Sequence, residues 1–316
     1  SGGSAVALAT GMAWLATGSD LGGSLRTPAS FCSIVGMRPS PGRVPHGPGR
    51  NPFQLLSVDG PMGRSVGDVA LMLDAEVGKH PNDPISLETP LTSFQDAVDN
   101  PRVPYRIGFT RDLGIGPVDS EVAEICASAA ARFAEVGTIV EESKPDCNDI
   151  LEIFQALRAA LFVGVRGPLL EKHRKFLKPE MIWNIEKGMS QSIGDLSKAW
   201  VAQGALYQRL MEWFEDYDLL VLPTAITPPF DVNRRYLDQL DNHVFDNYID
   251  WVYVSYIATL TSSPAISIPC GFTSNGLPVG IQLVGKPRAE AELLSYAAKL
   301  EEILNMGQHT PIDPFL

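Results

Sequence analysis

A short loop with the sequence G-S-D-L-G-G-S-L-R, residues 18–26, contains the residues best suited to chemistry. Two glycines precede Ser24, and because glycine lacks a Cβ atom, the backbone there can turn tightly and leave its N–H groups accessible. A serine after such a turn can project its hydroxyl into a cleft. The N–H groups of Leu21, Gly22, Gly23 and Ser24 can then point together at a developing negative charge. A nucleophilic oxygen beside fixed oxyanion donors is the arrangement that acyl transfer requires.

The loop alone also fits a simpler interpretation, a tight connection from a strand to a helix. Asp20 and Arg26 flank the serine, and we interpret them as a local ion pair that supports the loop rather than as reacting groups. A serine hydroxyl is a poor nucleophile at neutral pH, so Ser24 needs a base. Five histidines leave a Ser-His-Asp triad open, but no recognisable motif places any of them. We interpret His46, in a stretch rich in Gly and Pro, as a solvated side chain.

Four more sequence blocks give this loop a context. They are S-G-G-S at 1–4, F-C-S-I-V-G-M-R-P at 31–39, D-G-P-M-G-R-S at 59–65 and G-L-P-V-G-I-Q-L-V-G at 276–285. Together with the loop, their order and spacing resemble the amidase signature family, serine hydrolases of amide C–N bonds. The resemblance covers most of the chain and is weakest between about 146 and 216. Ser33 departs from the pattern, because the family commonly has glycine at that position.

The resemblance implies an acyl-enzyme mechanism with Ser24 as nucleophile, an oxyanion hole around it and Ser1 in a supporting position. In the family a lysine and a second serine, held on a cis peptide, relay the proton and complete a Ser-Ser-Lys triad. That second serine would lie immediately before Ser1 and the lysine further upstream, so neither is in this sequence. We therefore expect the chain to be the C-terminal part of a longer amidase, and these residues alone to be nearly inert.

Two other functions stay open beside an amidase that acts on a small-molecule amide. The glutamine-hydrolysing A subunit of a tRNA-dependent amidotransferase has the same signature and would need partner subunits. A truncated product that only offers a binding surface is the non-enzymatic alternative. A homodimer also stays open, since nothing in the sequence decides the oligomeric state.

Composition excludes several other classes of protein. The 316 residues are 45% hydrophobic and carry a net charge of −12, which disfavours direct binding to nucleic acid or to an anionic membrane. The four cysteines form no C-x-x-C pair, which favours reduced cysteines in a cytoplasmic protein. We interpret no segment as membrane-spanning, because the apolar stretch 251–260 is too short. The glycines match neither a Walker A loop nor a dinucleotide fingerprint, and no clean metal-ligand spacing occurs, so we expect no cofactor and no metal.

Hydrophobic patterns predict an α/β fold. The length of 316 residues alone suggests about two domains, whereas the resemblance implies a single amidase signature domain over 1–316. A strand, a helix and a strand at 105–110, 118–136 and 138–141 predict a right-handed βαβ unit with parallel strands. We expect a mixed, largely parallel central sheet covered by helices on both faces, with the buried strand 279–284 near its centre. Other buried strands are expected at 219–222 and 265–268.

Local signals predict several further elements. Small apolar residues predict a tightly packed helix at 2–11 and a short buried strand at 13–17. Ser65 and Asp68 resemble a capping box at the start of a helix. The segment 147–246, mainly helical at first and then rich in loops, is the least similar to the family, and we expect it to form the substrate side of the site.

Overall fold

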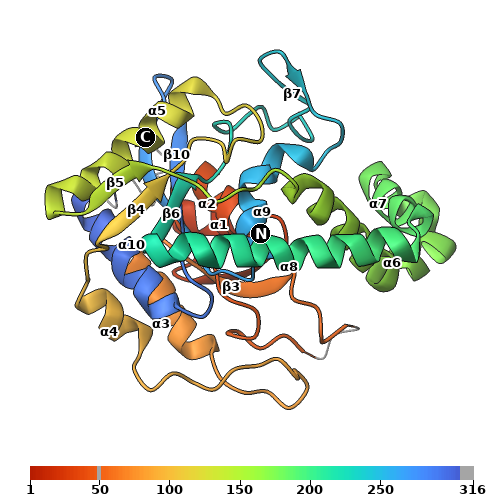
Figure 1. The fold of residues 1–316 in the computed structure, drawn as a ribbon, viewed down its shortest axis with the longest axis horizontal. Coiled ribbons are helices and arrows are strands. Elements are labelled where there is room, and N and C mark those ends of the chain that lie inside the picture. The colour runs from red at the N-terminus through yellow and green to blue at the C-terminus, as the bar shows by residue number, and fades with distance from the viewer. Residues whose placement is uncertain (48–50, 307–316) are drawn as a thin grey trace.

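An eight-stranded sheet forms the centre of the computed structural model, which describes residues 1–47 and 51–306 (Figure 1). Strand β10 lies near the middle of this sheet, and its residues 279–284 are all buried, as predicted. In spatial order the strands are β1 (Ala16–Asp20), β3 (Val58–Gly63), β2 (Val35–Arg38), β9 (Ala265–Phe272), β10 (Pro278–Val284), β6 (Leu219–Pro223), β4 (Arg106–Phe109) and β5 (Ile139–Glu142). A separate hairpin consists of β7 (Gln239–Leu240) and β8 (His243–Val244).

The sheet is mixed, as predicted, but its parallel part is smaller than expected. Five of the seven strand pairings in the described part of this sheet are antiparallel, and only β4–β5 and β4–β6 are parallel. A short turn at 273–277 joins β9 to β10, and a connection of that length can only join antiparallel neighbours. The predicted βαβ unit is confirmed, since β4 and β5 are parallel neighbours. This unit determines the relative direction of those two strands and of no other pair in the sheet.

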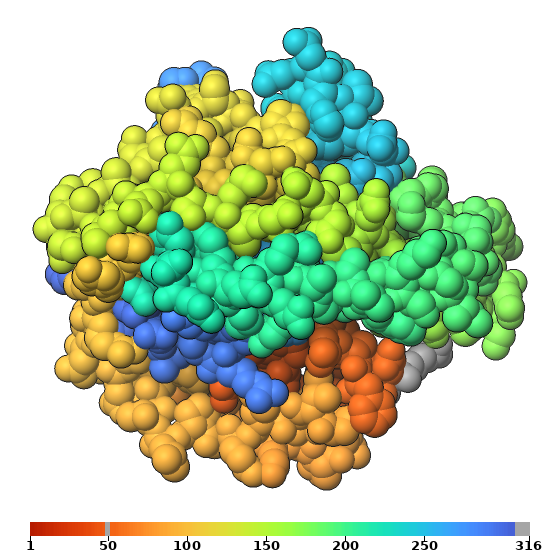
Figure 2. All heavy atoms as spheres, viewed as in Figure 1, coloured from red at the N-terminus to blue at the C-terminus, as the bar shows by residue number. Residues whose placement is uncertain are grey.

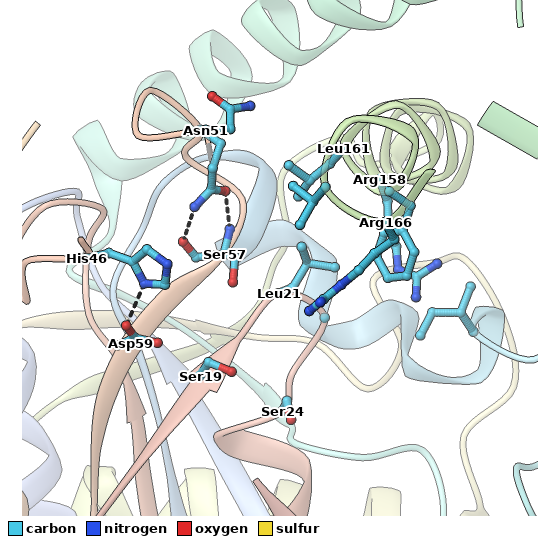
Figure 3. A pocket seen from close by; sticks show the side chains of 15 residues that line it. Ser19, Leu21, Ser24, His46, Asn51, Ser57, Asp59, Arg158, Leu161 and Arg166 are labelled. Atoms are coloured by element: carbon cyan, nitrogen blue, oxygen red, sulfur yellow. Dashed lines mark hydrogen bonds and ion pairs between the residues drawn. The ribbon is translucent and has the colours of Figure 1, made fainter. Parts of the chain in front are cut away.

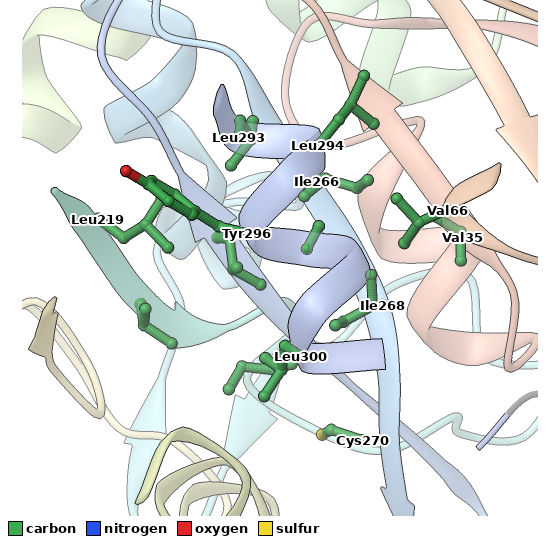
Figure 4. Packing of buried hydrophobic residues seen from close by; sticks show 14 of the residues in the cluster. Val35, Val66, Leu219, Ile266, Ile268, Cys270, Leu293, Leu294, Tyr296 and Leu300 are labelled. Carbon is green, nitrogen blue, oxygen red and sulfur yellow. The ribbon is translucent and has the colours of Figure 1, made fainter. Parts of the chain in front are cut away.

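Helices cover both faces of the sheet, as predicted. One face packs against α3 (Val66–Glu76), α5 (Ser120–Ala131) and α10 (Glu290–Leu304), and Figure 4 shows α10 lying over the sheet. The other face packs against α6 (Ile150–His173), α8 (Ile193–Asp216) and α9 (Tyr256–Leu260). Strand β6 is buried on both sides, because Leu219 and Val221 belong to the first core and Leu220 and Leu222 to the second. Figure 2 shows the green segment that contains α8 crossing one face of the molecule as a ridge.

The remaining helices complete these layers. Helices α1 and α2 form a third apolar cluster with Met62 of β3. The helix predicted at 2–11 is α1, and the segment 148–213 is mainly helical, as expected. Their bounds are α1 (Gly2–Ala9), α2 (Arg26–Phe31), α4 (Phe94–Asp99) and α7 (Pro179–Ser190), with 3-10 turns η1 (Arg132–Val136), η2 (Arg174–Phe176) and η3 (Asp250–Ser255).

Two local predictions have different outcomes. The capping box is confirmed, since Asp68 N donates to Ser65 Oγ at 3.0 Å and Ser65 N donates to the Asp68 carboxylate at 3.2 Å. The strand predicted at 13–17 begins instead at Ala16, and its residues alternate between partly buried and exposed before the buried Asp20. The reason is its place at the edge of the sheet, where β3 is its single neighbour in the described structure.

Helix α6 has the length and hydropathy of a membrane-spanning helix, which the sequence analysis did not recognise. The stretch Ile150–Phe176 has a mean hydropathy of 1.3 in its most apolar window. In the folded chain Ile150, Ile153, Phe154 and Leu157 are buried in the second core. Core packing therefore accounts for the apolar face of this helix.

The stability of the fold is expected to fall between about pH 5 and pH 8 because of Glu301. This carboxylate on α10 accepts the Val66 N–H at the start of α3 at 2.9 Å, and burial raises its pKa to about 7. An unfolded glutamate titrates near pH 4.3, so between these values the native state binds more protons and stability falls as pH rises. Glu301→Gln keeps an acceptor oxygen and removes the charge, so its melting temperature should depend less on pH.

The control for this prediction is Glu302→Gln, an exposed neighbour paired with Lys299. It should retain the pH dependence of the parent protein in thermal melts at pH 5, 6, 7 and 8. Part of the pH dependence of the melting temperature should remain in Glu301→Gln, because burial also raises the pKa of Glu76 to about 7. If the melting temperature of Glu301→Gln changed with pH as much as that of the parent protein, Glu301 would already be ionised at pH 5 in the native state.

Candidate active site

Ser24, the predicted nucleophile, lies in a tight turn between β1 and α2. Gly23 has φ of +94°, and a Cβ atom there would lie 2.9 Å from Thr27 Oγ1 and 3.0 Å from Ser255 Cβ. Only glycine fits this turn without strain. The Ser24 side chain is left exposed, and its Oγ accepts a hydrogen bond from the backbone nitrogen of Ser1 at 2.8 Å.

Ser1 is fixed against β1 beside this hydroxyl. Ser1 Oγ donates to the Ser19 carbonyl at 3.2 Å and accepts from the Ser19 N–H at 3.0 Å. Gly18 permits the approach, because a Cβ atom there would lie 2.3 Å from Ser1 Oγ. The structure thus brings Ser1 and Ser24 together, although they are 23 residues apart.

Three of the four predicted oxyanion donors are free to serve. The N–H groups of Leu21, Gly22 and Ser24 make no hydrogen bond within the described residues, and all three residues line the same pocket. The inclusion of Gly23 among these donors needs correction, because its N–H donates to Asp20 Oδ1 at 3.0 Å. The Gly23 N–H therefore holds the turn in shape and does not face the pocket.

Asp20 is a buried anchor for this turn, as its predicted supporting role requires. Its carboxylate forms a bidentate pair with Arg26, at 3.0 Å to Nε and 2.9 Å to Nη2, and also accepts the Leu25 N–H at 3.2 Å. Both side chains are fully buried. Burial alone would raise the pKa of Asp20, but the charges of Arg26 and Arg38 and the hydrogen bonds outweigh it and hold the pKa well below its usual range.

Two members of this buried network were missed by the sequence analysis. Arg38 Nη1 lies 3.2 Å from Asp20 Oδ1 and also donates to the Asp20 carbonyl. Arg26 Nη1 donates to Gln282 Oε1 and to the Ser255 carbonyl. Arg38 and Gln282 belong to the blocks 31–39 and 276–285, so those blocks were the available signal. Three of the five sequence blocks, 18–26, 31–39 and 276–285, therefore meet in one buried network below the turn.

A pocket of about 520 Å³ opens over Ser24. Figure 3 shows Ser19 and Ser24 at one side of it and Leu161 and Arg166 on the helix at another. This helix is α6, which contributes five lining residues from the segment 147–246. The remaining lining residues come from the turn itself, from Ile249 and from residues between His46 and Asp59.

His46 lies at the rim of this pocket and is not simply solvated. Its Nδ1 is 2.5 Å from Asp59 Oδ2, and the β1–β3 register places Asp59 opposite Ser19. These groups are half of a Ser-His-Asp arrangement. No hydrogen bond joins His46 to Ser24 among the described residues, so the triad is not formed.

Within residues 1–47 and 51–306, no side chain forms a hydrogen bond with Ser24 Oγ. No lysine lines the pocket, and no group of three or more His, Cys, Asp or Glu side chains within residues 1–47 and 51–306 could hold a metal ion. The four cysteines are free, and the nearest pair, Cys126 and Cys270, has its sulfur atoms 3.9 Å apart. The base that Ser24 needs is therefore not evident in this part of the structure.

Comparisons with known proteins agree with this geometry. Residues 1–294 match the model of a family described as Amidase. The chain is 30% identical over 310 residues to an acylamidase from Rhodococcus erythropolis, and this alignment covers 97% of the chain and 65% of that protein. It is 32% identical over 336 residues to the A subunit of a glutamyl-tRNA(Gln) amidotransferase from Moorella thermoacetica, covering 98% and 67%.

Solved structures give the same result. A bacterial aryl acylamidase of the amidase signature enzymes superposes with a TM-score of 0.88 at 26% identity, covering 97% of this chain and 66% of that one. The chain thus spans about two thirds of the length of the relatives that it matches.

Proposed function

The chain belongs to the amidase family, and we propose that it carries the nucleophile and oxyanion hole of an enzyme that hydrolyses the C–N bond of a small carboxylic amide. One observation carries this proposal. The Ser24 hydroxyl stands in a pocket of about 520 Å³ beside three residues, Leu21, Gly22 and Ser24 itself, whose N–H groups are unused within the described structure.

These groups support a two-step reaction. Ser24 Oγ loses its proton and attacks the amide carbonyl carbon, and the carbonyl oxygen becomes an oxyanion that the free N–H groups bind. The intermediate then expels the amine, which takes up a proton, and leaves an ester on Ser24. Water attacks this ester through a second oxyanion, which releases the carboxylic acid and restores the serine.

The position of Ser1 supports the proposal that the base for Ser24 lies outside the described pocket. Because the Ser1 nitrogen lies 2.8 Å from Ser24 Oγ, any residue bonded to that nitrogen would lie next to the nucleophile. The family resemblance implies a second serine at that position and a lysine on an upstream segment. We propose that these two groups complete the Ser-Ser-Lys triad, and that the 316 residues alone turn over simple amides very slowly.

The experiment uses a serine-directed phosphonate and peptide mass spectrometry. The 316-residue chain should react slowly. The same chain, extended before Ser1 by a segment that carries the lysine and second serine, should be labelled on Ser24 and should release ammonia or amine from amides. Full activity of the 316 residues alone, or labelling of another residue, would contradict the proposal. Absence of both labelling and turnover in the extended chain would favour a non-catalytic role.

A second candidate function rests on the 32% identity to the relative named as an amidotransferase component. If this chain has that function, glutamine should be its preferred amide, and partner subunits should be needed to use the ammonia. A comparison of ammonia release from glutamine and from simple acyl amides by the extended chain distinguishes the two candidates.

Substrate choice is proposed to reside in the segment 147–246, and mainly in α6. This helix supplies Arg158, Leu161, Phe162, Val165 and Arg166 to the pocket wall, whereas the turn with Ser24 is constrained by its buried anchor. Differences in α6 would therefore change which amides fit and leave the reacting groups in place.

A further inference from the structure

Arg158 of α6 is a buried cation in the wall between two cavities. Arg158 is 5% exposed, and it lines both the pocket over Ser24 and a second cavity of about 560 Å³. Phe162 also lines both cavities, and its ring lies 4.3 Å from the Arg158 guanidinium carbon. Charge at this position therefore bears directly on what the pocket can hold.

The positive charge of Arg158 has no anionic partner in the described structure. Its terminal nitrogens donate to Asn184 Oδ1 and, at 2.5 Å, to the Tyr248 hydroxyl, and both partners are neutral. No carboxylate lies within ion-pair distance among residues 1–47 and 51–306, and the buried Nε has no hydrogen-bond partner. By contrast, Arg26 and Arg38, which are fully buried below the Ser24 turn, both pair with Asp20.

A buried charge without a counter-ion is costly, and proteins normally pair such charges. Asn184 and Tyr248 hold the guanidinium in place but leave its charge uncompensated. A ligand carboxylate in the pocket would supply the missing charge, and it is the group that a guanidinium binds best. The opposite rim carries Asp59, which would repel the same group and so orient it towards α6.

We propose that Arg158 binds a carboxylate of the substrate, so that the preferred amides carry an acid group remote from the bond that is cut. The proposal names the substrate class for the hydrolysis proposed above and rests on it. Arg158 would act as a specificity residue, since it holds the far end of the substrate while Ser24 attacks the amide.

Binding to Ser24→Ala measured by calorimetry tests this, because no turnover is needed. The ligands are monoamides of dicarboxylic acids with one to four methylene groups, each compared with its uncharged diamide. At least one acid should bind about 10-fold or more tightly than its diamide, because hydrogen bonds to charged groups are worth about 1.5–3 kcal/mol. In the same background Arg158→Gln should remove this preference and retain the affinity for the diamide.

Two control variants distinguish a specific effect of Arg158 from an effect of overall positive charge and from misfolding. Arg174→Gln removes an exposed arginine that pairs with Glu186 and lines neither cavity, and it should retain the preference. Arg158→Lys keeps the charge without the planar fork and should reduce the preference only in part. Equal binding of acid and diamide by the parent protein, or a preference that survives in Arg158→Gln, overturns the proposal. In one further outcome, the chain extended before Ser1 binds the acid more tightly than the diamide and yet is never labelled on Ser24 by the phosphonate. That result would support the carboxylate site at Arg158 and would contradict the proposed hydrolysis.

Discussion

Ser24→Ala is expected to lower kcat for amide hydrolysis by about 10⁴- to 10⁶-fold in the chain extended before Ser1. The hydroxyl is the proposed attacking group, and loss of the serine nucleophile from a serine hydrolase has an effect of this size. KM should change little, because the pocket wall formed by α6 is untouched. The remaining rate should reflect binding and the oxyanion donors alone. Single-turnover release of amine, followed with a chromogenic amide, gives both constants.

Two variants make this result specific. Ser4→Ala removes a hydroxyl that donates to the Thr17 carbonyl at 2.9 Å, close to the site but without contact to Ser24, and should lower the rate less than about 10-fold. His46→Ala tests the alternative base at the pocket rim. If His46→Ala lost as much activity as Ser24→Ala, the base would be the His46–Asp59 pair, and the upstream lysine would be excluded as the base.

The turn that carries Ser24 could be predicted from sequence because the residues that determine it are close together in the chain. Two glycines, a serine and the adjacent Asp20 and Arg26 lie within nine residues, and their spacing alone indicates a tight turn with an exposed hydroxyl. The direction of the Gly23 N–H could not be predicted, since it depends on where the Asp20 carboxylate comes to rest. The helical character of 148–213 was also accessible, because it depends on short-range periodicity.

The long-range parts of the site could not be predicted. Arg26 and Gln282 are 256 residues apart and meet only after β10 has taken its place in the sheet. The antiparallel directions of most strands follow from which strands become neighbours, and periodicity within one strand carries no such information. The role proposed for Arg158 could not be predicted for the same reason, since it rests on the absence of a carboxylate within ion-pair distance among residues 1–47 and 51–306.

Asp20→Asn is expected to destabilise the protein by about 3–5 kcal/mol, the usual effect of removing one member of a buried ion pair. The change keeps the shape of the side chain but leaves Arg26 and Arg38 buried without an anion. The amide can still accept one of the two N–H groups, from Gly23 or Leu25, so the turn should loosen as well. Urea unfolding at pH 7 should show a lower midpoint with an unchanged slope.

The pH dependence of this loss identifies the charge as its cause. Since the native pKa of Asp20 is depressed, the unfolded state binds more protons at low pH, and the stabilisation rises with pH through that window. It is fully present above about pH 4 and is lost only as pH falls towards the native pKa. The difference between the parent protein and Asp20→Asn should therefore be constant from pH 5 to 8 and shrink below pH 4. Asp238→Asn, which removes an exposed ion pair with Arg234, should leave the midpoint unchanged. A parent protein and Asp20→Asn that unfold at the same urea concentration would show that the network around Asp20 does not hold the turn under Ser24.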